Sequence, residues 1–259
     1  MNVLEVCDLT KSYGSTVGAT DVTFTVGSGE IVGLVGPNGS GKSTALHCLT
    51  GLIPVDSGTV TIAGRILTDW RSKSAFGFVP DDLPVPELLT GREYLELVAS
   101  LQVTPIDWDV TRGLVEALHL NSAIDRTIDG YSHGMRRKIQ LVAALMHNPP
   151  LVILDEPFRG LDPESSAILK SILRIWSRTG KACLITTHDL LVAEQMCDRI
   201  VVLRDGVIIA YGTVAGLRER TGATTFEEAF ARLTGIDVAV AAAEATISTL
   251  FARVSQASS

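Results

Sequence analysis

The sequence predicts an α/β fold with a mostly parallel core sheet, an N-terminal antiparallel β-layer and an inserted helical subdomain. Three observations support this prediction. Short apolar runs, typical of strands buried on both faces, occur at residues 31–35, 151–154 and 182–187. Segments near the N-terminus instead alternate apolar and polar residues, as half-buried strands do. The middle of the chain, from about residue 91 to 120, has the apolar spacing of amphipathic helices.

The antiparallel layer is predicted from three alternating segments. Val3–Leu9 and Asp21–Val26 precede the first buried strand, and Thr59–Ala63 follows the first helix. The turn Gly27–Gly29 leads from this layer into the core. We therefore expect the chain to leave the layer, form one core strand and one helix, and then return to it.

A glycine-rich loop joins the buried strand at 31–35 to a helix expected over Ser43–Leu49. Its residues are Gly36, Pro37, Asn38, Gly39, Ser40, Gly41, Lys42 and Ser43. Glycines let backbone N–H groups turn toward phosphate oxygens, and the positive end of the following helix favours an anion there. Lys42 can reach the β- and γ-phosphates of a nucleotide, and Ser43 can ligate Mg²⁺. Because strand, loop and helix follow in the order that a phosphate-binding loop requires, a chance glycine-rich turn is disfavoured.

The middle of the chain is predicted to form a helical subdomain over about residues 83–150. A strand at Ala75–Val79 ends at Pro80, and the proline-rich stretch 81–86 is expected to be a loop. Two helical faces follow, and their apolar members are Tyr94, Leu95, Val98 and Leu101 in one helix and Val110, Leu114 and Leu118 in the next.

A third helix of this region is predicted to begin after Ser132, which is a good N-cap. Arg136, Arg137 and Lys138 fall in its first turns, where positive charge opposes the helix dipole. Two interpretations stay open: the three side chains are solvated, or an anion or an acidic surface lies beside them.

Polar residues follow the two later buried strands. Asp155 and Glu156 come at the end of the strand at 151–154, and His188 follows the strand at 182–187. Ligands bind at this carboxyl edge in open parallel sheets. Asp155 can hold Mg²⁺, Glu156 can orient or deprotonate the water that attacks a γ-phosphate, and His188 can bond that phosphate. Asp162 precedes Pro163 at a helix start, and capping alone would explain it.

Composition limits the class of protein. The chain has 259 residues, 46% of them hydrophobic, which is enough for one large core. Its 22 basic and 29 acidic residues give a formal charge of −7, so we expect no nucleic-acid partner. The four cysteines form no C-x-x-C pair, which favours neither a zinc site nor disulfides. No apolar run approaches the roughly 18 residues of a membrane span, so a membrane role would need a partner.

These motifs resemble those of the ATP-binding subunit of ABC transporters, and the resemblance covers roughly residues 1–235. The similar segments are Gly36–Thr44 for the Walker A motif, Leu151–Glu156 for the Walker B motif with its catalytic glutamate, Gly160–Asp162 for the D-loop and His188 for the switch histidine. The resemblance implies an ATP hydrolase that uses Mg²⁺, with Lys42, Glu156 and His188 as catalytic residues and Ser43 and Asp155 at the metal. All residues from Gly36 to Thr44 would bind the nucleotide.

Tyr13 falls where that family has an aromatic ring that stacks on adenine. From the sequence alone, Tyr13 lies in a polar stretch between two predicted strands, where ordinary packing is the alternative to stacking. The resemblance favours the stacking interpretation.

Two positions depart from the family pattern. The signature Leu-Ser-Gly-Gly-Gln is Tyr131–Met135 here and keeps only Ser132 and Gly134. This form is similar to that of exporters for drugs, peptides or polysaccharides. Asp81 stands where the Q-loop glutamine is usual, and its carboxylate can still ligate Mg²⁺ or water.

The resemblance also implies partners. In the family, two ATPase subunits form a head-to-tail dimer, in which each ATP lies between the Walker motifs of one chain and the signature of the other. Ser132, Gly134 and Asp162 would serve the partner's nucleotide in this way. The helical subdomain would contact an integral-membrane permease, which would hold the chain at the cytoplasmic face of the cell membrane.

A non-transport ABC ATPase, for iron–sulfur assembly or nucleic-acid maintenance, is the alternative to the exporter subunit. A P-loop GTPase is disfavoured because the chain has no Asn-Lys-x-Asp motif. Residues 1–235 are predicted to be the ATP-binding domain and 236–259 a helical tail. Ile247, Leu250, Phe251 and Val254 share one face of that tail, which we expect to pack on the body or on a second copy.

Overall fold

The computed structural model describes residues 1–14, 16–81, 84–102 and 105–257. Its main sheet has the strand order β10-β9-β3-β8-β7-β6. The strands from β9 to β6 are parallel to one another, and β10 pairs antiparallel with β9. The bounds are β3 (Ile31–Val35), β6 (Phe76–Val79), β7 (Leu151–Asp155), β8 (Ala182–Thr186), β9 (Arg199–Arg204) and β10 (Val207–Gly212). The predicted parallel core is confirmed.

A second, antiparallel sheet has the order β2-β1-β4-β5. Its strands are β1 (Asn2–Tyr13), β2 (Thr16–Gly27), β4 (Ser57–Ile62) and β5 (Arg65–Ile66). The predicted β-layer is therefore present, but its first two strands are longer than the alternation indicated. Tyr13 is the last residue of β1, whereas the sequence placed it between strands. Its position is still exposed, because the strand ends there.

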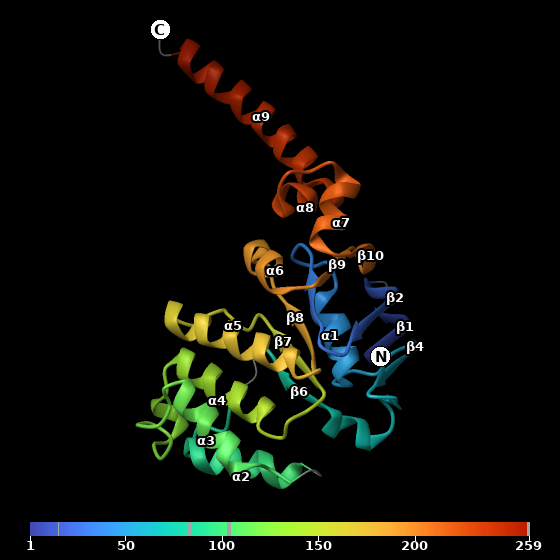
Figure 1. Cartoon of the computed structure of the whole chain (residues 1–259). Helices are drawn as coiled ribbons and strands as arrows, with labels where there is room; N and C mark the ends of the chain where they lie inside the picture. The colour runs from blue at the N-terminus through green and yellow to red at the C-terminus, as the bar shows by residue number, and fades with distance from the viewer. Residues whose placement is uncertain (15, 82–83, 103–104, 258–259) are drawn as a thin grey trace.

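Helices cover the main sheet on both faces, and short 3₁₀ turns occupy Trp70–Ala75 and Ile128–Gly130. The helices are α1 (Lys42–Thr50), α2 (Gly91–Leu101), α3 (Trp108–Ala117), α4 (His133–Leu145), α5 (Pro163–Arg178), α6 (Leu190–Met196), α7 (Val214–Thr221), α8 (Phe226–Thr234) and α9 (Ile236–Ala257). Figure 1 shows α2, α3 and α4 gathered beside β6, which is the helical subdomain that the sequence predicted. Two members of the predicted 81–86 loop, residues 82 and 83, lie outside the described residues.

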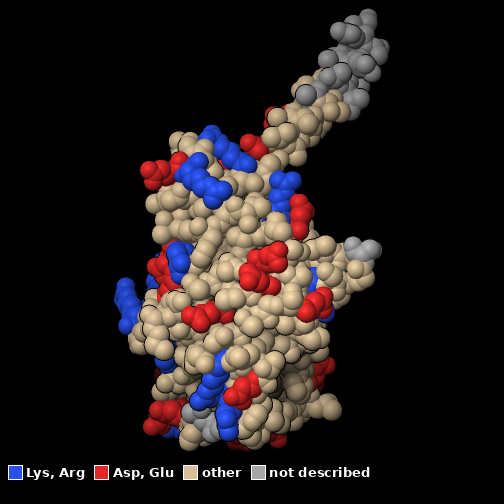
Figure 2. Space-filling view, turned by 90° about the vertical axis from the view of Figure 1, so that its right-hand side faces the viewer, with Lys and Arg blue, Asp and Glu red and all other residues tan. Residues whose placement is uncertain are grey.

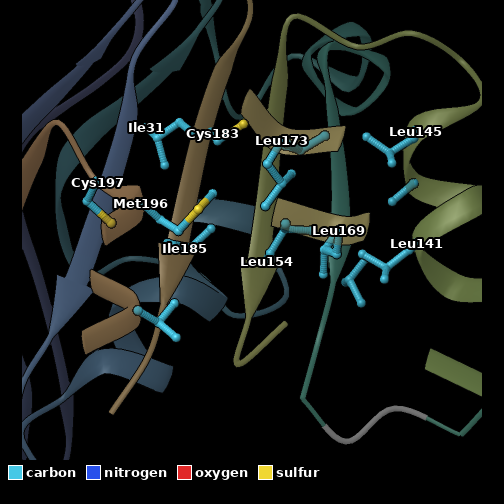
Figure 3. Close-up of a cluster of buried hydrophobic side chains, with 14 of the residues drawn as sticks. Ile31, Leu141, Leu145, Leu154, Leu169, Leu173, Cys183, Ile185, Met196 and Cys197 are labelled. Atoms are coloured by element: carbon cyan, nitrogen blue, oxygen red, sulfur yellow. The ribbon is translucent and has the colours of Figure 1, made fainter. Parts of the chain in front are cut away.

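Alternate residues of the core strands face two different clusters of buried side chains. Ile31 and Val35 of β3 join a cluster that includes α4, α5, α6 and α8, while Val32 and Leu34 join one formed with α1 and the antiparallel sheet. Figure 3 shows the first cluster, in which Leu169 and Leu173 of α5 lie beside side chains of β7 and β8. Both faces of the parallel sheet are thus buried, as its continuous apolar strands predicted.

The predicted faces of α2 and α3 are partly wrong. Leu101 is 74% exposed and Val110 is 47% exposed, although both were expected in the packed stripe. Leu101 is the last residue of α2, and the packed residues Tyr94, Leu95 and Val98 lie earlier in the helix. In α3 the exposed member is Val110, whereas Leu114 packs against the core and Leu118, directly after the helix, is fully buried. Thr111 and Val115 complete the buried side.

The C-terminal helix α9 extends away from the body in Figure 1. Ile247, a member of the predicted apolar stripe, is 50% exposed. The side chains of its other members, Leu250, Phe251 and Val254, lie outside the described residues, so the predicted packing of this face remains a prediction. Among the described residues, no helix combines the length and the apolar character that a membrane crossing demands. On the face shown in Figure 2, acidic and basic side chains are interspersed over the body.

Gly77 allows α4 to pack closely on β6. A Cβ atom added to Gly77 would lie 2.0 Å from the carbonyl oxygen of Ala144, which belongs to the α4 backbone and cannot rotate away. We expect Gly77→Ala to lower the free energy of unfolding by about 2 kcal/mol, the usual cost of overpacking. This corresponds to a fall of roughly 4–8 °C in the melting temperature of a chain of this size.

Gly113→Ala is the matched control, since no other part of the fold lies within 4 Å of a Cβ at that position in α3. Alanine favours a helix over glycine by up to about 1 kcal/mol, so this variant should melt at the same or a higher temperature. Equal melting temperatures for Gly77→Ala and the wild-type chain would contradict the close packing.

Candidate functional site

An open pocket of about 1000 Å³ lies at the carboxyl ends of β3, β6, β7 and β8. It brings together residues from segments that are far apart in the sequence, and it includes most of the predicted site. The predicted residues that line it are Tyr13, Asn38, Gly39, Ser40, Gly41, Lys42, Ser43, Thr44, Asp81, Asp155, Glu156 and His188.

The glycine-rich loop has little room for side chains. A Cβ on Gly36 would lie 2.2 Å from the carbonyl oxygen of Leu203, and one on Gly41 would lie 2.2 Å from that of Gly18. Gly41 also has a φ of +98° and is the N-cap of α1. Among the described residues, the buried hydroxyl of Ser40 has no hydrogen-bond partner. A loop of this shape at the start of a nine-residue helix is suited to hold an anion.

Lys42 is held inside this loop. Its Nζ donates to the carbonyl oxygens of Gly36 and Pro37, at 2.7 and 3.0 Å. Partial burial lowers the pKa of Lys42, and the charges of Glu156 and Asp155 oppose that effect. Neither Gly36 nor Pro37 lines the pocket, but their carbonyl oxygens hold the ammonium group of Lys42, which does line it.

Asp155 and Glu156 are oriented by the neighbouring strand. The hydroxyl of Thr186 in β8 donates to Oδ1 of Asp155, its register partner in β7. The backbone N–H of Glu156 donates to the carbonyl and hydroxyl oxygens of Thr186, at 3.2 and 3.1 Å. Glu156 has a φ of +47°, a left-handed conformation that is uncommon outside glycine. Strand β8 thus holds the carboxylate of Asp155 and the backbone of Glu156 in place.

Glu156 and His188 form a pair at the pocket. Nδ1 of His188 lies 2.8 Å from Oε1 of Glu156. The Glu156 side chain is only 15% exposed, whereas that of His188 is 67% exposed. The histidine therefore lies on the solvent side of the carboxylate, where it can contact both Glu156 and a ligand that enters the pocket.

Arg137 is buried beneath the pocket, at 3% exposure, so the solvated interpretation is wrong for this residue. Its guanidinium donates to the carbonyl oxygens of Pro80, Asp155 and Glu156. Burial lowers the pKa of Arg137, and the negative charges of Asp81, Asp155 and Glu156 oppose that effect. For Arg137 the second interpretation, an acidic surface beside the helix, is therefore the correct one. That surface is formed by the backbone carbonyl groups and the carboxylates of the site.

Ser132, Gly134 and Asp162 lie outside the pocket of their own chain. Ser132 is exposed and caps α4 by accepting from the N–H of Met135 at 3.2 Å. Asp162 caps α5, and its hydrogen bonds from Ser165 lower its pKa to about 2. Gly134 packs close to Gly160, since an added Cβ would be 3.2 Å from the Gly160 carbonyl oxygen. Gly134 of the signature segment thus lies beside Gly160 of the D-loop, and none of the three residues lines the pocket of Lys42.

Sequence reasoning missed Arg159 and Thr186. Arg159 lines the pocket, and its Nη1 lies 2.6 Å from Oδ2 of Asp81. The N–H of Arg159 donates to the carbonyl of Glu156 at 3.1 Å. No local pattern in the sequence singles out Arg159, because its partner is 78 residues away. Thr186 was read only as part of a buried strand.

The donor set suits Mg²⁺ that is shared with a phosphate ligand. The hydroxyl of Ser43 and the carboxylate of Asp155 line one pocket, and hard oxygen ligands are the kind that Mg²⁺ prefers. Within the described part of the chain, no three His, Cys, Asp or Glu side chains are grouped as a metal cluster would require. A magnesium ion here would depend on the ligand's own oxygens to complete its shell, as is usual for nucleotide sites.

Comparisons with known proteins agree with this geometry. The family model described as "ABC transporter" matches residues 19–159. The chain is 34% identical over 220 residues to the lipopolysaccharide export system ATP-binding protein LptB of Haemophilus influenzae, which covers 82% of this chain and 91% of that protein.

Two solved structures are similar as well. One is an ATP-binding subunit of an ABC transporter, with a TM-score of 0.84, 33% identity and coverage of 89% of this chain and 99% of that one. The other is a dimeric ATP-binding cassette in a post-hydrolysis state, bound to ADP and Pi. Its TM-score is 0.72 at 25% identity, and the match covers 81% of this chain and 98% of that one.

Proposed function

This chain belongs to the ABC transporter family, and we propose that it is the ATP-hydrolysing subunit that drives a separate integral-membrane permease. Nucleotide binding and hydrolysis are the activity of the family. One observation carries the assignment of the site: the phosphate cradle with Lys42 opens into the same pocket as the Glu156–His188 pair.

The residues of the site can be given roles. We assign the triphosphate to the loop 36–44, where Lys42 exchanges its two carbonyl partners for phosphate oxygens. The exposed ring of Tyr13 lines the same pocket and is assigned to the adenine. Ser43 and Asp155 would hold Mg²⁺, which supplies positive charge that stabilises the phosphoryl group during transfer.

Glu156 is assigned as the residue that orients the attacking water and accepts its proton. His188 is assigned to hold the Glu156 carboxylate and to bond the γ-phosphate. Because the backbone of Glu156 is held by β8 and by Arg137, and its carboxylate lies against His188, little motion is needed to position the water.

We assign Ser132, Gly134 and Asp162 to the nucleotide of a second copy. All three are absent from the pocket of their own chain, and the similar cassette bound to ADP and Pi is a dimer. A head-to-tail dimer would close the pocket with these residues. Both sets of motifs are present in this chain, so two identical copies would suffice.

The permease partner is proposed from the family and from the helical subdomain, and it would place the chain at the cytoplasmic face of the membrane. Export is proposed as the direction because the signature has an exporter-like form and the relative LptB is part of an export system. Residues 1–235 are proposed as the ATPase domain and 236–259 as an appended tail. These assignments favour an exporter subunit over a non-transport ABC ATPase.

Purification from native membranes in mild detergent tests the proposal. A tagged chain should bring down one polytopic membrane protein in a fixed ratio, and the complex should hydrolyse ATP. The Lys42→Ala variant, expressed at the same level, is the control, and it should retain the membrane partner without hydrolysis. Recovery of the wild-type chain with no membrane protein would contradict the permease assignment.

A further inference from the structure

Asp81 puts an additional negative charge into the nucleotide pocket. Among the described residues that line the pocket, the carboxylates are Asp81, Asp155 and Glu156 and the permanent cations are Lys42 and Arg159. With neutral histidines the lining has a net charge of −3 + 2 = −1. Without Arg159 the lining charge would be −2, which opposes the binding of a polyanion.

Arg159 is positioned to neutralise Asp81. The two side chains form an ion pair with a distance of 2.6 Å between Nη1 and Oδ2. They come from the segments that follow β6 and β7, which are adjacent parallel strands. The backbone of Arg159 is anchored to Glu156, so the guanidinium lies in the same cluster of charges as the reacting end of the pocket.

Resting on the proposed function, we propose that Arg159 is an affinity-determining residue of the ATP site, which neutralises the carboxylate of Asp81 so that three carboxylates can line a pocket for a triphosphate. Arg159 and Asp81 therefore act as one unit. The pair keeps the local charge close to that of a site with a neutral residue at position 81. It also holds the Asp81 side chain against the loop that contains Glu156.

A double-mutant cycle on ATP affinity tests this inference. ATP binding is measured by calorimetry at low ionic strength in EDTA, so that neither hydrolysis nor bound metal contributes. Arg159→Gln should raise the Kd for ATP by about tenfold, and raised salt should reduce this difference because the pair is partly exposed. ADP, which carries less charge, should be affected less.

Recovery of ATP affinity when Asp81→Asn is added to Arg159→Gln distinguishes an electrostatic role of Arg159 from a purely structural one. In Asp81→Asn combined with Arg159→Gln, the lining charge is −2 + 1 = −1, the same as in the wild-type chain. We expect this double variant to bind ATP within about twofold of wild type. Asp81→Asn alone should bind ATP at least as tightly as wild type.

The ion pair of Arg92 and Asp125 is the matched control. It has a similar distance of 2.7 Å and is exposed, but it lies in the helical subdomain outside the pocket. Arg92→Gln should leave the Kd for ATP unchanged. An unchanged Kd in Arg159→Gln, or no rescue by Asp81→Asn, would overturn the inference while ATP binding by the wild-type chain stands. Failure of the wild-type chain to bind ATP would overturn the proposed function as well.

Discussion

Glu156→Gln is expected to slow ATP hydrolysis by at least about 100-fold while leaving ATP affinity at least as high as that of the wild-type chain. The amide keeps the size of the side chain and can still face Nδ1 of His188, which lies 2.8 Å from the carboxylate in the wild type. It cannot accept the proton of the attacking water. The substitution therefore removes the base and preserves the pocket, and the backbone bonds from Glu156 to Thr186 are untouched.

The measurement is phosphate release under saturating ATP, together with ATP binding and the ATP-dependent dimer on a sizing column. Glu156→Gln should accumulate as the ATP-bound dimer, because the closed state is no longer consumed by hydrolysis. Glu164→Gln is the matched control: this side chain is 75% exposed in α5 and does not line the pocket. Turnover near the wild-type rate in Glu156→Gln would remove Glu156 from the role of base.

Arg137→Met is expected to lower the free energy of unfolding by about 3 kcal/mol, because hydrogen bonds from a charged donor to buried acceptors are lost. The guanidinium donates to the carbonyl oxygens of Pro80, Asp155 and Glu156, and methionine offers them no donor. The expected fall in melting temperature is roughly 6–12 °C. Hydrolysis should fall as well, since the same bonds hold the backbone of both pocket carboxylates.

Arg136→Met is the control for this substitution. Arg136 is the neighbouring residue, and its side chain, 32% exposed, pairs with Glu87 on the surface and donates to the carbonyl oxygens of Tyr131 and Asp129. Exposed ion pairs contribute up to about 1 kcal/mol, and groups near the surface can bond to water instead, so this variant should lose less stability than Arg137→Met. Arg137→Lys should recover only part of the loss, because an ammonium group cannot reproduce the planar fork of the guanidinium. Equal melting curves for Arg137→Met and Arg136→Met would show that the buried bonds add no stability.

The sequence predictions are accurate where neighbouring residues decide the structure, and less accurate where contacts between distant segments decide it. The strand, loop and helix around Lys42 were predicted correctly because glycine positions and apolar runs are local signals. In α3, Leu114 and Leu118 were predicted correctly as packed residues, but Val110 is exposed, because the extent of the packed face of a short helix depends on what lies beside it. Tyr13 was placed between strands for a similar reason: pairing with Thr16 extends β1 beyond its alternating segment.

The sequence by itself determined the phosphate cradle, the acidic pair Asp155–Glu156 and the strand-end His188, because each is defined by a few consecutive residues. Only the tertiary structure decided that Arg137 lies under the site and that Arg159 pairs with Asp81. Both depend on β6 lying beside β7, a pairing between segments more than 70 residues apart. The sequence gives the charge of each side chain, but the residue with which that side chain pairs depends on which strands become neighbours in the sheet.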